Sequence, residues 1–314
     1  MEGYFWRVTD VERKSVLVVL CGVNRHPEGS WATVALATHP GGFVRSAVLS
    51  NAFAAADEYR VSAGDGAFRA SATEVHLDLG DDARVDFSLT RPVSWPHALG
   101  GGGVFSVVPF FGQYWHPHML GGAARGTVRV ADEVWEFDGA DVYAEKNWGK
   151  GFPERWWWGQ AQGFERPDVC VAFSGGVLTA GRLSATVGSV IVRVGDQVIR
   201  LTPPFSVVRS HTDGKRWEVR ARGLGHRVHI VGEAAGSPHV LPVPLPAERR
   251  NVDTDFEHLA GHMTLEVSGR VDYRGETELA GLEIGHRPSK LEAAAEATDR
   301  SSTVPSIQTI RSNA

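Results

Sequence analysis

Apolar and polar residues alternate along most of this chain, between short turns that contain Gly or Asp. Residues 75–79 alternate up to the turn Gly80–Asp82, and residues 85–89 alternate on the return. A period of two residues indicates a half-buried β-strand, and a Gly/Asp turn between two such runs predicts a hairpin. The same unit recurs, with turns at 131–133, 195–196 and 223–225. No long amphipathic helix separates these hairpins, so we predict an antiparallel all-β protein.

A weak internal repeat indicates that the chain consists of two halves. Tyr4–Trp6 is followed by the apolar run Val16–Leu20, and Trp156–Trp158 is followed at a similar distance by Val169–Phe173. Each half is close to the size of one closed β-barrel that can hold a ligand. We therefore predict two tandem β-domains, residues 1–140 and 141–286, with one large β-sandwich as the alternative. Residues 287–314 are largely polar and are predicted to be a disordered or loosely docked tail.

Composition excludes several classes of protein. The 314 residues are 42% hydrophobic and 22% charged, with a net charge of −5, which is typical of a soluble globular protein and does not suit nucleic acid as a partner. No apolar run is long enough to span a bilayer, and the N-terminus shows no signal peptide. The 2 cysteines form neither a disulfide framework nor a CxxC knuckle. We expect a reducing compartment, the cytoplasm.

Rare residue types are concentrated near the middle of the chain. Four of the 10 tryptophans and two of the few lysines lie between residues 146 and 158. If residues 156–162 form a strand, Trp156, Trp158, Gln160 and Gln162 share one face, because strand side chains alternate. Two indoles and two amides on one face suit the wall of a largely aromatic ligand pocket.

The segment just upstream offers a carboxyl group to the same region. In an extended chain Tyr143, Glu145 and Asn147 share a face, and they alternate with Lys146 and Trp148. Two interpretations remain open at this point. Glu145 is either a functional carboxyl or one half of a salt-bridged corner, with Lys146, between the two halves of the chain.

The residues from Tyr143 to Gln160 resemble the signature of the tocopherol cyclase family: Tyr, Glu-Lys-Asn-Trp-Gly, Phe-Pro, Trp-aromatic-Trp and Gln, in that order. Weaker matches extend the resemblance over about residues 2–286, and they lie at Gly3–Arg7, Trp115–Gly122 and Leu279–Gly285. Trp157 and Gly159 depart from the bulkier plant pattern. The resemblance implies two lipocalin-like barrels with a ligand pocket between or within them. It also implies a relation to carotenoid 1,2-hydratases and fungal Diels–Alderases.

The family's reaction closes a prenylated hydroquinone into a chromanol, and it needs a carboxylic acid that is still protonated near neutral pH. Burial in an apolar pocket raises the pKa of a carboxyl group and so keeps it protonated. The resemblance therefore implies Glu145 as the acid, with Tyr143 and Asn147 beside it. If Glu145 is instead ion-paired with Lys146 or Arg155, the candidates become Asp57, Glu58, Asp141, or a proton on His116 or His118.

An aromatic wall and polar contacts complete the predicted site. Indole faces stabilise a desolvated cation by roughly 2 kcal/mol each. We expect the substrate to be a hydrophobic small molecule, such as a prenylated aromatic compound or a polyene, and we expect no cofactor. Peripheral membrane contact and oligomeric state stay open. The predicted binding residues are Trp6, His116, His118, Trp148, Trp156, Trp158, Gln160 and Gln162.

Other motifs give weaker signals. His116-Pro117-His118 has the spacing of a metal pair on a strand, but Met119–Val128 contains no acidic residue, so we predict no metal. His258 and His262, with Glu257, do not match the His-Glu-x-x-His motif of zinc proteases and are expected to be surface histidines. The run Gly100–Gly103 lacks the Lys-Ser/Thr of a phosphate-binding loop and is predicted to be a flexible loop.

Three rival functions remain open from the sequence. A non-catalytic protein that binds a terpenoid or quinone needs the aromatic wall and no acid. A pericyclase or hydratase of the same fold needs similar surroundings. A carbohydrate-active β-protein is the third, since tryptophan-rich faces also stack against sugars and glycosidases use paired carboxylates.

Overall fold

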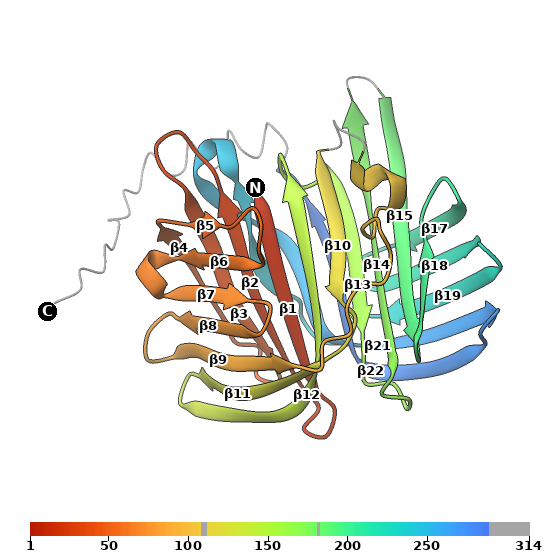
Figure 1. Ribbon diagram of the computed structural model, residues 1–314, viewed down its shortest axis with the longest axis horizontal. Coiled ribbons are helices and arrows are strands. Elements are labelled where there is room, and N and C mark those ends of the chain that lie inside the picture. The colour runs from red at the N-terminus through yellow and green to blue at the C-terminus, as the bar shows by residue number, and fades with distance from the viewer. Residues whose placement is uncertain (108–111, 181–182, 289–314) are drawn as a thin grey trace, which may run out of the picture.

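The computed structural model describes residues 1–107, 112–180 and 183–288, and these residues form two curled antiparallel β-sheets (Figure 1). The all-β, lipocalin-like prediction is confirmed. Three short 3-10 turns lie within the described residues: η1 (Gly64–Gly66), η2 (Gly103–Val107) and η3 (Pro246–Glu248). In that part of the chain, no helix combines the length and apolar character needed to cross a bilayer. The predicted tail lies almost entirely outside the described residues.

The first sheet follows the order β4-β3-β2-β1-β12-β11-β9-β8-β7-β6-β5, and β10 also pairs with β12. Its 12 strands, among the described residues, are β1 (Glu2–Asp10), β2 (Ser15–Asn24), β3 (Trp31–His39), β4 (Val44–Ser50), β5 (Phe53–Ala54), β6 (Arg60–Ala63), β7 (Phe68–Ser71), β8 (Glu74–Asp78), β9 (Ala83–Thr90), β10 (Gln113–Met119), β11 (Ala123–Val130) and β12 (Glu133–Gly149).

The second sheet follows the order β16-β15-β14-β13-β22-β21-β19-β18-β17, and β20 also pairs with β21. Its 10 strands, among the described residues, are β13 (Arg155–Ala161), β14 (Val169–Ala180), β15 (Leu183–Val194), β16 (Gln197–Leu201), β17 (Ser206–Thr212), β18 (Arg216–Gly223), β19 (His226–Glu233), β20 (His239–Leu245), β21 (Arg250–Gly269) and β22 (Tyr273–His286).

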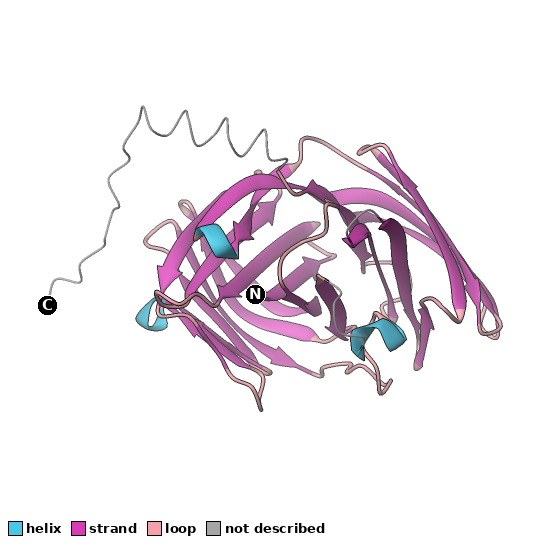
Figure 2. Cartoon of the chain, turned by 90° about the horizontal axis from the view of Figure 1, so that it is seen from above, coloured by secondary structure: helices cyan, strands magenta, loops and turns pink. Residues whose placement is uncertain are grey.

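The apolar and polar residues that alternate in the sequence lie on opposite faces of each strand. In β9 every second residue is buried and every residue between is exposed, which places the apolar side chains on the concave side. Each sheet curls around its own apolar core, as the view from above shows (Figure 2). Trp6 and Phe68 lie in the first core, and Trp217 and Phe173 lie in the second. The cores are therefore filled with side chains, and the space for a ligand lies elsewhere.

The chain passes from the first sheet to the second between Gly149 and Arg155. Strand β12 thus continues nine residues beyond residue 140, where the sequence suggested a boundary. The division into domains at 140/141 stays a prediction. Strands β20 and β21 of the second sheet also lie against β3 of the first. The two sheets therefore share a long contact in addition to the connection between β12 and β13.

The glycine-rich segment 99–107 forms a second link between the sheets. The hydroxyl groups of Ser189 and Thr202 both donate to the carbonyl oxygen of Gly101, at 2.7 and 2.8 Å. Arg200 donates to the carbonyl oxygen of Leu99 at 2.8 Å. The flexibility predicted for Gly100–Gly103 stays a prediction, and the glycines here permit close packing. A Cβ on Gly101 would lie 2.8 Å from Cδ of Pro117.

Candidate functional site

A cavity of about 200 Å³ lies between the two sheets. Strands β1, β10 and β12 of the first sheet line one side of it, and strands β13, β14, β20, β21 and β22 of the second line the other. The segment around Gly102 and Phe105 contributes to the wall as well. The pocket is therefore between the sheets, one of the two positions that the sequence left open, and both halves of the chain are needed to enclose it.

Glu145 lies on this cavity and receives three hydrogen bonds at one oxygen. Its Oε2 accepts from the Tyr143 hydroxyl at 2.5 Å, from Nε1 of Trp115 at 2.8 Å and from Nε1 of Trp158 at 2.9 Å. The side chain is almost completely buried. Trp158 comes from the second sheet, and Tyr143 and Trp115 come from the first. A single carboxyl oxygen thus joins donors from both sheets.

Two opposing effects act on the Glu145 carboxyl. Burial raises its pKa, because the charged form loses its hydration, and this effect is the larger one. The hydrogen bonds from Tyr143, Trp115 and Trp158 lower the pKa, because they stabilise the carboxylate. The net result is a pKa above the usual range. The group therefore tends to hold its proton while being surrounded by donors that accommodate its negative charge.

The ion-paired alternative for Glu145 is contradicted. Lys146 points to the opposite face of β12, where its Nζ lies 2.9 Å from Oε2 of Glu2 and 4.9 Å from the centre of the Tyr4 ring. Arg155 is exposed. Strand alternation separates Glu145 from its sequence neighbour, so the salt-bridged corner predicted as an alternative does not form.

Asn147 also lines the cavity, on the same face of β12 as Glu145. It faces Gly3 of β1 across the strand pair, and a Cβ on Gly3 would lie 2.3 Å from Oδ1 of Asn147. The absence of a side chain at position 3 therefore makes room for the Asn147 amide in this position. Tyr143, by contrast, is fully buried behind Glu145 and does not line the cavity. Burial raises the pKa of its hydroxyl.

Trp156 and Trp158 line the cavity as the alternation of β13 predicted. Nε1 of Trp156 donates to Oε1 of Glu283, and the Trp158 ring meets the Phe5 ring at 5.3 Å in an edge-to-face arrangement. The backbone opposite Trp156 is Gly285, where a Cβ would lie 2.0 Å from Cζ2 of Trp156. The aromatic wall therefore depends on a glycine on the neighbouring strand.

Gln160 and Gln162 share the face of Trp158 but lie beyond the cavity, in the buried contact between the sheets. Nε2 of Gln162 donates to the carbonyl oxygen of Val142 in the first sheet at 3.3 Å. Nε2 of Gln160 reaches Oε1 of Gln162 at 3.5 Å. Gln162 thus makes a contact that joins the sheets, and Gln160 hydrogen-bonds to Gln162.

Trp148 and Trp6 do not line the cavity, contrary to the sequence prediction. Trp148 lies on the opposite face of β12 and stacks on Tyr114, with ring centres 5.5 Å apart. Trp6 is completely buried in the core of the first sheet, where it stacks near Tyr4. Both corrections follow from the alternation of strand side chains. Trp148 is an odd number of residues from Glu145 and so faces away from it.

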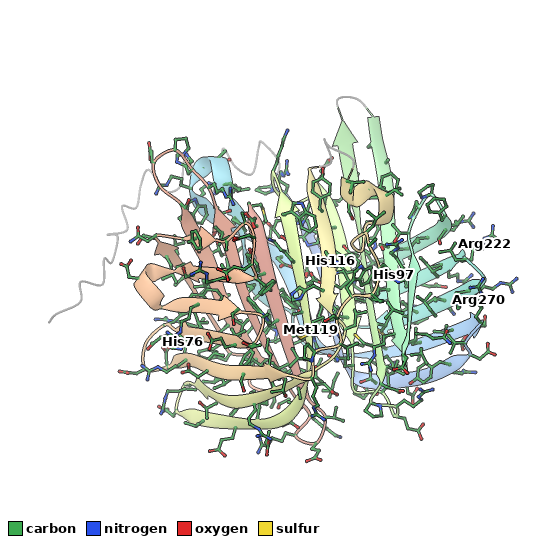
Figure 3. All side chains as sticks on the ribbon, viewed as in Figure 1. His76, His97, His116, Met119, Arg222 and Arg270 are labelled. Carbon is green, nitrogen blue, oxygen red and sulfur yellow. The ribbon has the colours of Figure 1, made fainter. Side chains whose placement is uncertain are left out.

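His116 and His118 lie beside the cavity and do not line it. His116 is near the middle of the molecule, close to the junction of the two sheets (Figure 3). Nε2 of His118 meets the Tyr59 hydroxyl at 3.0 Å. Burial lowers the pKa of His116 to about 4 and that of His118 to about 3. Both rings are therefore neutral near pH 7, which contradicts a histidine-bound proton as the acid.

The remaining alternative acids also lie away from the cavity. Asp57 and Glu58 are exposed, and Glu58 pairs with Arg60 at 2.7 Å. Asp141 is half-buried beside β1 and β11, and burial raises its pKa, but it does not line the pocket. Of the candidate acids that the sequence offered, Glu145 is the one that reaches the cavity.

Three further carboxyls line the cavity and were missed by the sequence reasoning: Asp255, Glu257 and Glu283. They come from β21 and β22, where Glu257 faces Glu283 directly across the strand pair. Glu283 in turn faces Trp158 on β13. The three carboxyls therefore share one face with the indole that donates to Glu145.

Burial dominates the titration of this carboxyl cluster. It raises the pKa of Asp255 and that of Glu257 well above their usual range, and it raises the pKa of Glu283 to about 7. Mutual repulsion of the three charges acts in the same direction. One feature of the sequence could have indicated this cluster. Glu283 interrupts the otherwise apolar stretch 279–284, and a charged residue within an apolar strand indicates a special environment.

His258, next to Glu257, was expected at the surface, and this was wrong. It is buried, with Nδ1 3.3 Å from the carbonyl oxygen of Ala235 and its ring against Trp217.

Comparison with known proteins supports the resemblance found in the sequence. The family model described as tocopherol cyclase-like matches residues 67–286. The tocopherol cyclase of Zea mays, described as chloroplastic, is 32% identical over 238 residues, which cover 66% of this chain and 47% of that protein. A probable tocopherol cyclase of Oryza sativa subsp. japonica is 33% identical over 141 residues, which cover 43% of this chain and 27% of that protein. The chain thus spans less than half the length of these curated relatives.

Solved structures share the fold. CghA in complex with Sch210972 superimposes with a TM-score of 0.60 at 12% identity, covering 90% of this chain and 88% of that one. Kievitone hydratase from Nectria haematococca gives a TM-score of 0.53 at 13% identity, covering 91% and 88%. At these identities the likeness concerns the fold alone. The family-model match extends over more than half of the chain, and this chain therefore belongs to the tocopherol cyclase-like family.

Proposed function

We propose that this protein is an intramolecular cyclase that protonates the double bond of a prenylated hydroquinone, or a related terpenoid, and closes a chromanol-type ring. The observation that carries the proposal is the environment of Glu145. It is a buried carboxyl on an indole-walled cavity, with three donors on one of its oxygens. The tocopherol cyclase relatives support the same class of reaction.

The environment of Glu145 suits a general acid. Burial keeps the proton in place before reaction, and that proton would lie on Oε1, since Oε2 accepts three hydrogen bonds. When the proton moves to the alkene carbon, a C–H bond forms and negative charge develops on the carboxylate. The three donors are already oriented toward that charge, so they stabilise the transition state more than the resting acid.

The other half of the reaction needs a protected cation and a nucleophile. Protonation leaves a tertiary carbocation, which the faces of Trp156 and Trp158 stabilise while bulk water is excluded. The substrate's own hydroxyl oxygen then forms the C–O bond, and its proton returns to the protein. One proton is given and one is recovered, so the net reaction is an isomerisation in which no bond is oxidised or reduced.

The test is incubation of the protein with a geranylated hydroquinone in D₂O, followed by chromatography and mass spectrometry. We expect a chromanol with one deuterium on the carbon next to the new quaternary centre. Glu145→Gln should lower the rate about 10²- to 10⁴-fold, the usual contribution of a general acid. Glu136→Gln, an exposed change on the same strand, is the matched control and should leave the rate unchanged.

Different products would replace the proposal with a defined alternative. A tertiary alcohol in place of the chromanol would indicate that water captures the cation, which is hydratase chemistry. Tight binding of the quinol without turnover would indicate a carrier. Full activity of Glu145→Gln would remove Glu145 as the acid.

A further inference from the structure

Glu257 is the least satisfied polar side chain on the cavity. It is fully buried, it lines the pocket, and within the described part of the chain neither Oε1 nor Oε2 has a hydrogen-bond partner. A buried polar group without a partner costs about 1–3 kcal/mol, and native proteins rarely leave one in that condition without a functional reason. This side chain therefore calls for a partner that enters the cavity.

The nearest positive charge does not supply that partner. Arg7 is also fully buried, and its terminal nitrogens donate to the carbonyl oxygens of Leu259 and Leu279 and to the hydroxyl of Thr9. A Cβ on Gly281 would lie 3.0 Å from Nε of Arg7 and 3.5 Å from Oε1 of Glu257, so the two groups border the same glycine without pairing. The charge of Arg7 lowers the pKa of Glu257 less than burial raises it, and the terminal nitrogens of Arg7 donate elsewhere and leave the carboxyl oxygens without a hydrogen bond.

Trp158 lies near both Glu145 and Glu257. Its Nε1 donates to Glu145, and its Cζ3 lies 3.1 Å from the same Cβ position on Gly281 that Glu257 borders. Glu145 therefore meets the indole at its nitrogen, Glu257 lies near the Gly281 position that Cζ3 also borders, and both carboxyls line the cavity. A ligand lying along this indole would meet both carboxyls.

We propose that Glu257 hydrogen-bonds the hydroxyl group of the substrate that becomes the ring oxygen, so that the cavity selects molecules with a free hydroxyl near the double bond. This inference rests on the proposed function and adds an anchor for the substrate hydroxyl. A hydroxyl group can both donate to and accept from a carboxyl, which satisfies the oxygens that are otherwise without a partner.

The surroundings of Glu257 favour a neutral hydroxyl over other ligands. A cationic amine would need an ionised carboxylate, and burial together with the charge of Glu283 disfavours ionisation of Glu257 more than Arg7 favours it. In the described part of the chain, no group of three or more His, Cys, Asp and Glu side chains could hold a metal ion. An apolar ligand would leave both oxygens unsatisfied.

The experiment measures binding without turnover. Isothermal titration calorimetry would compare 2-hexyl-1,4-hydroquinone with its dimethyl ether, neither of which carries an alkene that can be protonated. We expect the wild-type protein to bind the hydroquinone about ten-fold more tightly, the ratio that one net hydrogen bond gives. Glu257→Gln, whose amide both donates and accepts, should keep most of that preference. Glu257→Leu should abolish it.

Two further variants make the result unambiguous. Glu278→Gln, an exposed change on β22 beside the strand of Glu257, should retain the preference for the hydroquinone. Glu257→Met is a second apolar replacement in case the leucine variant does not fold. Equal affinities of the wild-type protein for the two ligands would overturn the inference, as would an undiminished preference in either apolar variant. Because neither ligand reacts, these outcomes are independent of whether the protein cyclises a prenylated substrate.

Discussion

The stabilising contribution of Glu283 to this fold should be lost as the pH rises from 5 to 8, and replacing Glu283 should remove that loss. Burial raises the pKa of Glu283 from 4.5 to about 7 in the folded protein. A carboxyl of this kind keeps its proton longer when folded than when unfolded. Its contribution to stability is therefore complete below pH 4.5 and is lost as the pH rises through 7.

The size of the effect follows from the two pKa values. Holding the proton up to pH 7 instead of 4.5 corresponds to roughly 3 kcal/mol, and most of that is lost between pH 5 and pH 8. The neutral histidines His116 and His118 act in the opposite direction, because their lowered pKa values stabilise the fold above pH 6.5. They act equally in both proteins, so the informative quantity is the difference between the wild type and Glu283→Gln.

Urea unfolding followed by tryptophan fluorescence at pH 5, 6, 7 and 8 measures this difference. Between pH 5 and pH 8 we expect the free energy of unfolding of the wild type, minus that of Glu283→Gln, to fall by roughly 2–3 kcal/mol. Glu278→Gln is the matched control, because its side chain lies on the same strand and is 80% exposed. Parallel curves for the wild type and Glu283→Gln would refute the reasoning.

Three further predictions concern the wall and the interior. Tyr143→Phe removes one hydrogen-bond donor from Glu145, so cyclisation should slow about a hundredfold. Because that hydrogen bond lowers the pKa of Glu145, the pH above which activity declines should move upward in the variant. An unchanged pH–rate profile would contradict this. Gly285→Ala should displace Trp156 and lower the free energy of unfolding by about 1–3 kcal/mol, measured by thermal unfolding. The affinity for the hydroquinone, measured by calorimetry, should also weaken. An unaltered stability and affinity would show that the Trp156 ring can move freely. Cys170 is buried away from the cavity lining and should react with a thiol reagent after denaturation and not before, so rapid labelling of Cys170 in the native protein would be inconsistent with the fold.

The fold was largely predictable because its signal is local. Alternation such as that of residues 83–90 needs only neighbouring residues to place a strand and its buried face. Glu145 could be found for a related reason, since the residues that distinguish it lie within a short, unusual stretch. Trp148 shows how the same reasoning fails. Its residue type suggested the aromatic wall, although alternation already placed it on the other face of β12.

Contacts between distant segments could not be predicted. Glu257 and Glu283 reach the cavity because β22 pairs with both β13 and β21, and nothing near either residue specifies that order. Their sequence surroundings indicate strands but do not indicate which strands are neighbours. The partners of Glu145 show the same limit. Trp158 was expected as part of a wall, and its hydrogen bond to the carboxyl became visible only when the two sheets were placed together.

The hydrogen bonds from Ser189 and Thr202 to the Gly101 carbonyl affect how the substrate preference of such proteins can change in evolution. A segment from the first third of the sequence packs against the second sheet and is hydrogen-bonded to it. The two halves are therefore not interchangeable modules. A chimera that joined the N-terminal half of one relative to the C-terminal half of another would have to preserve this contact between the Gly101 segment and the second sheet, which is far in sequence from the junction of the two halves. Changes in substrate preference are therefore easier to reach by point substitution within the enclosure than by shuffling halves.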